Sequence, residues 1–291
     1  MKLGIVTPAL TLLPRAHAQW EETATYTDVV DIVREAERLG YHHCTCSEHV
    51  AVPVEVAKVR GGRYFDPLAT FGALGAQTQT IRFAAHVLVL GYHHPLAIAK
   101  RYGTLDVVTG GRVILGVGVG SLQEEFELLG ADFDHRGALG DDAMRALRAS
   151  LSQPQPEYHG EYYDYSGFVV DPCAVQARVP LWVGGRTYRS LRRAVELGDG
   201  WAPFALRTEE IAEMLKRARA TEAWDARQSP FDVILQNEHP LDPLAEAERV
   251  TDQLGRFTAA GATGVNVRFV HHSPAHYCEQ LAALAELAAL A

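Results

Sequence analysis

The chain has 291 residues, of which 47% are hydrophobic and 22% are charged, and its formal net charge is −9. This composition is typical of a globular protein, and the negative charge argues against nucleic acid, which binds basic surfaces. No apolar run approaches the roughly 18 residues of a membrane-spanning helix, so we expect no membrane partner. The four cysteines form no C-x-x-C pair, which predicts free thiols and a cytoplasmic location.

Short β-branched runs alternate with longer amphipathic stretches along the chain. KLGIVTP (2–8) is the first expected strand, because its prolines do not fit a signal peptide, and TDVVDIVREAERLG (27–40) is the first helix. Further strands are expected at 42–49, 81–90, 112–120, 180–185, 199–204, 231–238 and 264–269. Further helices are expected at 66–78, 95–109, 123–151, 188–197, 208–224, 245–260 and 275–290. Eight strand–helix units predict a closed (β/α)8 TIM-type α/β barrel.

The barrel is expected to form a single domain over residues 1–291, with an irregular insertion at about 152–178 between its halves. The rival architecture is a doubly wound sheet that binds a nucleotide at GVGVGS (116–121). It does not fit, because the third glycine of G-x-G-x-x-G falls at Ser121 and the glycines follow the fourth strand rather than the first. We expect Gly118 and Gly120 to let a ligand approach the backbone.

Active sites of such barrels lie at the C-terminal ends of the strands. His49 ends the second strand, where it suits acid–base chemistry near neutral pH; the alternative is a capping or core histidine. Gly184 and Gly185 end a strand and open a helix, where bare N–H groups favour a phosphate. Arg186 and Thr187 would add a charge and a hydroxyl, although the pair could also be only a tight turn.

Histidines recur at the strand ends as adjacent pairs: His42–His43, His93–His94 and His271–His272. Neighbouring strand residues point to opposite faces, so these pairs do not form a metal cluster, and we predict no metal site. A hydrolase or lyase barrel would need a metal cluster or two convergent carboxylates, and the sequence indicates neither.

Four segments together resemble the bacterial-luciferase-like family of flavin and deazaflavin oxidoreductases. They are SEHVAVP (47–53), HPLAIAKRYGTLDVVTGGRVILGVGVG (94–120), EEFELLGADFDHRG (124–137) and PLWVGGRTYRSLRRAVELGDGW (180–201). A tyrosine-rich segment, YHGEYYDY (158–165), lies between the two halves. The match runs through nearly the whole chain and is closest to the branch that uses the deazaflavin coenzyme F420, with FMN as the alternative.

The resemblance implies roles for residues at four strand ends. Glu48 and His49 match the family's catalytic acid–histidine pair, with Glu in place of the commoner Asp. A non-prolyl cis peptide in a bulge of the third strand, which backs the coenzyme ring, would fall at His86–Val87. The family's phosphate site matches Gly184, Gly185, Arg186 and Thr187. Some deazaflavin relatives carry a glutamate acid where this chain has Ser121, so its proton-donor role is open.

The activity implied is hydride transfer at C5 of F420, to or from a small organic substrate. FMN would instead imply a luciferase-like monooxygenase. A non-catalytic barrel homologue is the third possibility, although such a protein would lose the Gly184–Gly185 and Glu48–His49 features. We also expect a homodimer. The loop Ala9–Glu22 and the insertion Ser152–Arg178 are expected to shape the substrate pocket, but their residues indicate no substrate class.

Overall fold

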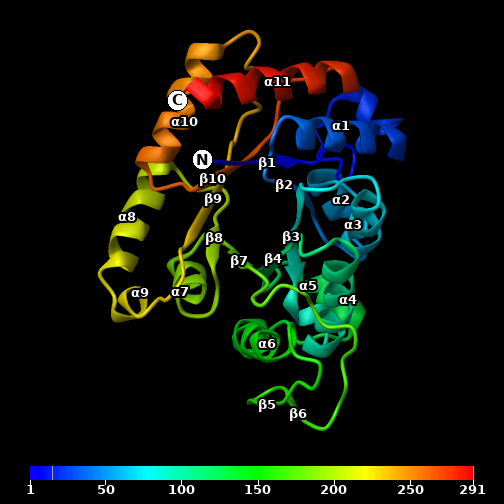
Figure 1. Cartoon of the computed structure of the whole chain (residues 1–291), viewed down its shortest axis with the longest axis vertical. Coiled ribbons are helices and arrows are strands. Elements are labelled where there is room, and N and C mark those ends of the chain that lie inside the picture. Colours follow the sequence, from blue (N-terminus) through cyan, green and yellow to red (C-terminus); the bar gives the residue numbers. More distant parts are fainter. Residues whose placement is uncertain (15, 291) are drawn as a thin grey trace.

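Parallel strands alternate with helices along the chain and close into a barrel (Figure 1). The computed structural model describes residues 1–14 and 16–290, and in that part of the chain eight strands form the barrel. In chain order these are β1 (Lys2–Val6), β2 (His43–Cys46), β3 (Arg82–Val89), β4 (Val113–Gly118), β7 (Leu181–Gly184), β8 (Gly200–Ala202), β9 (Asp232–Gln236) and β10 (Gly264–Val267). The strand β10 closes the ring by pairing with β1. The predicted (β/α)8 barrel is confirmed.

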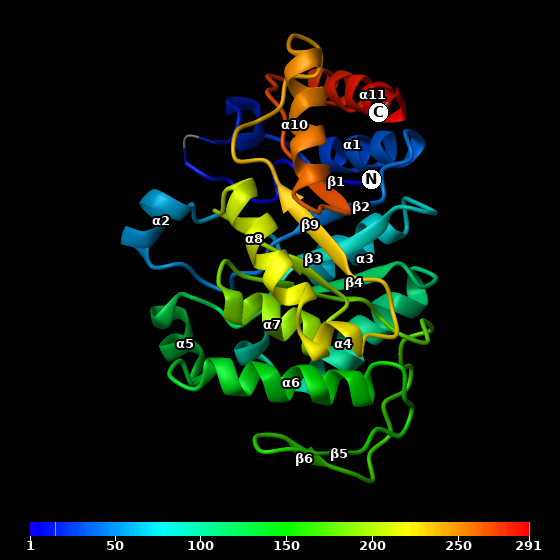
Figure 2. The same ribbon diagram turned by 90° about the vertical axis from the view of Figure 1, so that its left-hand side faces the viewer.

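Helices follow the strands and cover the outside of the barrel (Figure 1). They are α1 (Tyr26–Arg38), α2 (Val54–Arg60), α3 (Pro67–Gly75), α4 (Pro95–Val108), α5 (Gln123–Leu129), α6 (Arg136–Ser150), α7 (Tyr188–Leu197), α8 (Thr208–Arg219), α9 (Glu222–Asp225), α10 (Ala247–Ala259) and α11 (Pro274–Leu290). The helix α2 was not predicted. It buries none of its residues and stands out from the barrel in Figure 2, so no hydrophobic periodicity marks it.

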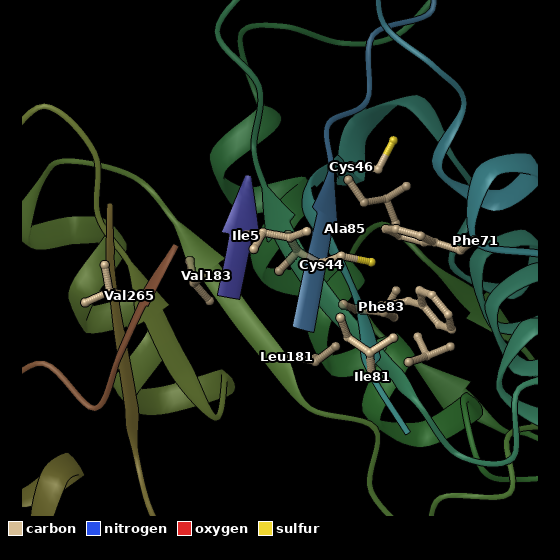
Figure 3. Close-up of a cluster of buried hydrophobic side chains, with 14 of the residues drawn as sticks. Ile5, Cys44, Cys46, Phe71, Ile81, Phe83, Ala85, Leu181, Val183 and Val265 are labelled. Atoms are coloured by element: carbon tan, nitrogen blue, oxygen red, sulfur yellow. The ribbon is translucent and has the colours of Figure 1, made fainter. Parts of the chain in front are cut away.

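The strands are apolar because both of their faces are buried. Outward residues such as Ile5, Cys44 and Phe83 lie against the helical layer, where the ring centroids of Phe83 and of Phe71 on α3 are 5.3 Å apart (Figure 3). A second buried cluster, which includes Trp182, fills the barrel interior. Its members are Ala84, Ile114, Trp182, Ala202 and Ile234.

The insertion after α6 forms a small hairpin of β5 (Tyr158–His159) and β6 (Asp164–Tyr165). Figures 1 and 2 both show this hairpin beside α6. Asp142 of α6 accepts hydrogen bonds from the backbone N–H groups of Tyr162 (2.8 Å) and Tyr163 (3.1 Å).

The expectation that this insertion shapes the substrate pocket is wrong. In the described part of the chain, none of its residues lines the cavity at the C-terminal ends of the strands. The reason is topological: the helices run antiparallel to the strands, so a segment that follows α6 starts at the opposite end of the barrel. Gln176 accordingly bonds to Arg82 and to the carbonyl of Val113, where β3 and β4 begin.

Across residues 1–14 and 16–290, no helix combines the length and the apolar character that crossing a bilayer requires.

Candidate functional site

A cavity of about 410 Å³ opens at the C-terminal ends of the barrel strands. Most of the predicted site residues line it: Glu48, His49, His86, Val87, Gly118, Gly120, Ser121, Gly184 and Gly185. The loop after β1 also contributes, through residues that include Leu10, Leu13 and Glu21. Arg186 and Thr187 lie beyond its edge, at the start of α7. The structure therefore brings together residues from both halves of the chain.

One wall of the cavity is built from a valine between two glycines. The peptide bond between His86 and Val87 is cis, as the resemblance implies, and the hydroxyl of Ser47 donates to the carbonyl of His86 (2.9 Å). A Cβ at Gly118 or at Gly184 would come within 2.7 Å of a Val87 methyl carbon. Only glycine therefore leaves room for Val87 at these two positions. We call Val87, Gly118 and Gly184 the glycine wall; it is apolar and free of long side chains.

The end of β4 continues the same side of the cavity. Gly120 has a φ of 79°, which favours glycine, and a Cβ there would come within 2.5 Å of the Phe126 ring. Ser121 lines the cavity next to it, and its hydroxyl oxygen lies 3.5 Å from Nη1 of Arg60 on α2. This position supplies a hydroxyl rather than the carboxylic acid of some deazaflavin relatives.

Glu48 and His49 are neighbours in sequence but have different partners. Glu48 is buried, accepts the backbone N–H of Val89 (2.7 Å), and has its other oxygen 2.7 Å from Nε2 of His93. It therefore anchors the end of β3. The ring of His49 turns the other way, where its Nδ1 lies 2.6 Å from a carboxylate oxygen of Glu125.

Glu125, on α5, is buried and holds His49 in place. One of its oxygens accepts the backbone N–H groups of Val50 (2.6 Å) and Ala51 (3.2 Å), and the other accepts from His49 and from the hydroxyl of Tyr92 (2.8 Å). Burial acts to raise the pKa of the Glu125 carboxyl, but these hydrogen bonds outweigh it and hold the pKa below its ordinary value.

The ionised Glu125 determines which nitrogen of His49 carries the hydrogen. A carboxylate can only accept, so Nδ1 of His49 is the donor, and in the neutral ring Nε2 keeps a lone pair. His49 lines the cavity, so Nε2 is the nitrogen left for a ligand there. We call His49, Tyr92 and Glu125 the histidine edge. Such an arrangement can take a proton from a bound molecule or give one back.

Sequence reasoning missed Glu125 and Tyr92 as site residues. Glu125 lies in the first turn of α5. Acidic residues are common there, because the positive end of the helix dipole stabilises their charge, and they usually face solvent. Its neighbour Glu124 does so and is exposed. The sequence signals were that Glu125 lies in the family-like segment 124–137 and precedes the apolar residue Phe126. That pattern alone does not connect the side chain to the end of β2.

The strand-to-helix turn after β7 has the features of an anion site. Gly185 has a φ of 141°, and a Cβ there would come within 2.6 Å of Ser190 Cβ. Thr187 caps α7, because its hydroxyl oxygen accepts the N–H of Ser190 (3.3 Å), while Arg186 is exposed. The Thr187 hydroxyl oxygen thus serves as a helix cap, its O–H can still donate, and Arg186 supplies the charge.

Within the described residues, no group of three or more His, Cys, Asp or Glu side chains is placed to hold a metal ion.

Comparison with known proteins points to one family. The model of the luciferase-like monooxygenase family matches residues 1–238. An uncharacterized protein of Mycobacterium tuberculosis is 29% identical over 225 residues, which cover 73% of this chain and 77% of that protein. The F420-dependent glucose-6-phosphate dehydrogenase of Nocardia farcinica is 28% identical over 179 residues, or 60% of this chain and 52% of that enzyme. The oxygenase component of the flavin-dependent trigonelline monooxygenase of Acinetobacter baylyi is 22% identical over 251 residues, or 84% and 68%.

Solved structures share the fold. A monooxygenase from Streptomyces bottropensis superposes with a TM-score of 0.77 at 20% identity over the whole of both chains. The F420-dependent tetrahydromethanopterin reductase of Methanopyrus kandleri does so with a TM-score of 0.74 at 16% identity, covering 98% of this chain and 97% of that one.

Proposed function

The chain belongs to the luciferase-like monooxygenase family, and from this premise we propose that it is an oxidoreductase that transfers a hydride between F420 and a small organic substrate. Its relatives include an F420-dependent enzyme and a flavin-dependent one, so the family alone leaves the coenzyme open. The observation that carries the proposal is the histidine edge. Oxidising an alcohol by hydride loss releases a proton, and reducing a carbonyl takes one up, so this chemistry needs an acid–base group beside the reacting carbon.

The residues around the cavity fit a deazaflavin or a flavin. The glycine wall would face the ring, because Val87, Gly118 and Gly184 all line the cavity and none of them has a long side chain. The backbone N–H groups of Gly184 and Gly185, the start of α7 and the Arg186 side chain would hold the phosphate. When bound, F420 supplies or accepts a hydride at C5.

The side chains of this chain then have separate tasks. His49 holds or moves the proton at the substrate oxygen through Nε2, while Glu125 fixes the tautomer and stabilises the charged ring. Glu48 holds the end of β3, and with it the position of Val87. Leu10 and Leu13, from the loop after β1, line the cavity and would exclude water from the bound substrate.

An FMN-dependent monooxygenase is the second candidate, and the flavin-dependent relative supports it. Titration of the purified protein with F420 and with FMN, followed by absorbance, decides between the two. We expect F420 to bind more tightly than FMN. Binding of FMN alone would overturn the proposal in favour of a monooxygenase, and binding of neither would favour a non-catalytic homologue.

We further propose a cytoplasmic homodimer. The cysteines Cys44, Cys46, Cys173 and Cys278 are free, as suits a reducing compartment. Sedimentation equilibrium would test the dimer, and a mass equal to one chain would contradict it.

A further inference from the structure

The cavity has a polar side, to which the proposed function assigns no role. Gln236 ends β9 and Arg268 directly follows β10, and both line the cavity. The side chain of Asn266 faces the barrel interior, where its Oδ1 lies 2.5 Å from Nε2 of His43. Side chains two residues apart on a strand point the same way, so Arg268 faces the same interior one level higher.

The backbone of Arg268 is fixed before any ligand binds. Its N–H donates to Oδ1 of Asn237 (2.9 Å), and its carbonyl accepts from Nδ2 of the same residue (3.0 Å) and from the N–H of Leu241 (2.8 Å). Asn237 is buried. The arginine therefore projects from a rigid support, as a recognition residue does.

The Arg268 guanidinium forms no ion pair with the described residues. Within residues 1–14 and 16–290, its one hydrogen bond is a long contact of 3.4 Å to the carbonyl of Ala16, and no carboxylate oxygen lies within 4.0 Å. Glu21, which is buried and lines the same cavity, acts on the guanidinium from further away; its two oxygens accept backbone N–H groups from Ala9 and Ala18 (2.7 Å each), and neither forms a hydrogen bond with Arg268. A partly buried cation with free N–H groups is stabilised when an anion binds to it.

Gln236 adds a second donor on the same side. Its side-chain amide forms no hydrogen bond with the described residues, although it borders the cavity. The guanidinium plane with one amide beside it matches a carboxylate, which accepts two parallel N–H groups from arginine. A dianionic phosphate would leave more charge uncompensated at a single cation.

We propose that Arg268 and Gln236 bind a carboxylate group of the substrate. The proposal rests on the function proposed above, because it places the reacting carbon at His49. In the barrel, β1 lies between β10 and β2, so a molecule over the end of β1 reaches both Arg268 and His49. The glycine wall, on β3, β4 and β7, stays free for the coenzyme ring. The substrate class is therefore a small organic acid with its oxidisable or reducible carbon away from the carboxylate.

Matched pairs of acids and amides test this assignment. Butyrate, hexanoate, benzoate and phenylacetate, each paired with its amide, would be titrated calorimetrically into the protein with and without bound coenzyme. In the wild type we expect at least one acid to bind about tenfold or more tightly than its amide, since a charge-assisted pair contributes roughly 1.5–3 kcal/mol. Inorganic phosphate, the probe for the alternative anion, should bind more weakly than that acid.

Two variants and a control locate the effect. Arg268→Gln should reduce the acid preference to less than threefold, and Arg268→Lys should keep part of it. Arg256→Gln, which removes an exposed cation on α10, should leave it unchanged. Equal binding of every acid and amide, or an acid preference that survives in Arg268→Gln, overturns the proposal. So does an Arg268→Gln variant that loses coenzyme affinity and changes the acid preference only when the coenzyme is present, because Arg268 would then serve the coenzyme. Failure of the function proposal appears separately, in the absorbance titration.

Discussion

The glycine wall and the histidine edge lie at the same end of the barrel but are built in opposite ways. The glycine wall depends on missing side chains: Gly118 and Gly184 leave room for Val87, and all three positions are strand residues. The histidine edge depends on side chains from separate segments, with His49 after β2, Tyr92 after β3 and Glu125 on α5.

On the function proposed above, this difference would separate binding from chemistry. The glycine wall is apolar, so it would recognise the proposed coenzyme ring by shape rather than by charge. The histidine edge contains an ionised carboxylate, a histidine and a tyrosine, and it can handle a proton. Substitutions in the two regions should therefore have different consequences: the first should change coenzyme affinity, and the second should change turnover.

The largest effect is expected from His49→Ala. It removes the proposed acid–base group. Such a group typically contributes about 10²–10⁴-fold to a rate, so single-turnover hydride transfer should slow by at least tenfold. Coenzyme affinity should stay within twofold, because the glycine wall is untouched. Thermal melting of the same preparation is the control. If the variant is fully active per folded molecule, His49 is only a structural residue and the acid–base assignment is wrong.

Glu125→Gln should have the next largest effect. It keeps the size of the side chain but removes the charge that fixes the His49 tautomer, and we expect turnover to fall by roughly 10–100-fold. The KM for the substrate should stay within about twofold, because Glu125 does not line the cavity, whereas a general loss of structure would change both quantities. Glu124→Gln is the matched control, since its side chain is exposed. Equal effects of the two variants would exclude a specific role for Glu125.

The same carboxylate should make stability depend on pH. The pKa of Glu125 is lower in the folded protein than its ordinary value of 4.5. Such a group stabilises the fold above that ordinary pKa, and the stabilisation is lost as the pH falls through the lower folded value. The free energy of unfolding of the wild type, measured by urea titration, should therefore fall more steeply below pH 4.5 than that of Glu125→Gln. Parallel curves would contradict the lowered pKa.

The sequence predicted the barrel well because each strand–helix unit is a local pattern. Asp66 and Pro67, for example, mark the start of α3, and the structure places them there. The residues of the glycine wall could also be predicted from the sequence, since they lie near the C-terminal ends of predicted strands. The contact between His49 and Glu125 was not, because it joins residues 76 positions apart across two loops. The absence of an ion pair at Arg268 was equally unpredictable, because it depends on where the fold places the carboxylates of distant segments.

Gly184→Ala tests the glycine wall. Its Cβ would come within 2.7 Å of Val87 and push that side chain, and overpacking of this kind costs roughly 1–3 kcal/mol. Since Val87 borders the cavity, we expect much of the change to appear as about a tenfold loss of coenzyme affinity. Gly72→Ala on α3 is the matched control, because a Cβ there meets nothing within 4 Å. Proton transfer at His49 should be unaffected. Unchanged affinity in the folded variant would remove Gly184 from the coenzyme site.

The smallest effects are expected at the start of α7, where the coenzyme phosphate is proposed to bind. Gly185 is a poor test position, because its φ of 141° and its closeness to Ser190 mean that a side chain would strain the turn. Thr187→Ala is a better one. It removes a helix cap and should lower the free energy of unfolding by about 1 kcal/mol.

If the Thr187 hydroxyl also contacts the phosphate, Thr187→Ala should weaken coenzyme binding by roughly three- to tenfold, the equivalent of one hydrogen bond. Thr187→Ser keeps the hydroxyl and should restore both quantities. Arg186→Gln should weaken coenzyme binding without lowering stability, because Arg186 is exposed and caps nothing. Stability and coenzyme affinity together therefore distinguish a capping role of Thr187 from a role in binding the phosphate. A Thr187→Ala variant that is less stable but binds the coenzyme normally would show that Thr187 only caps the helix. The phosphate would then depend on Arg186 and the two glycine N–H groups.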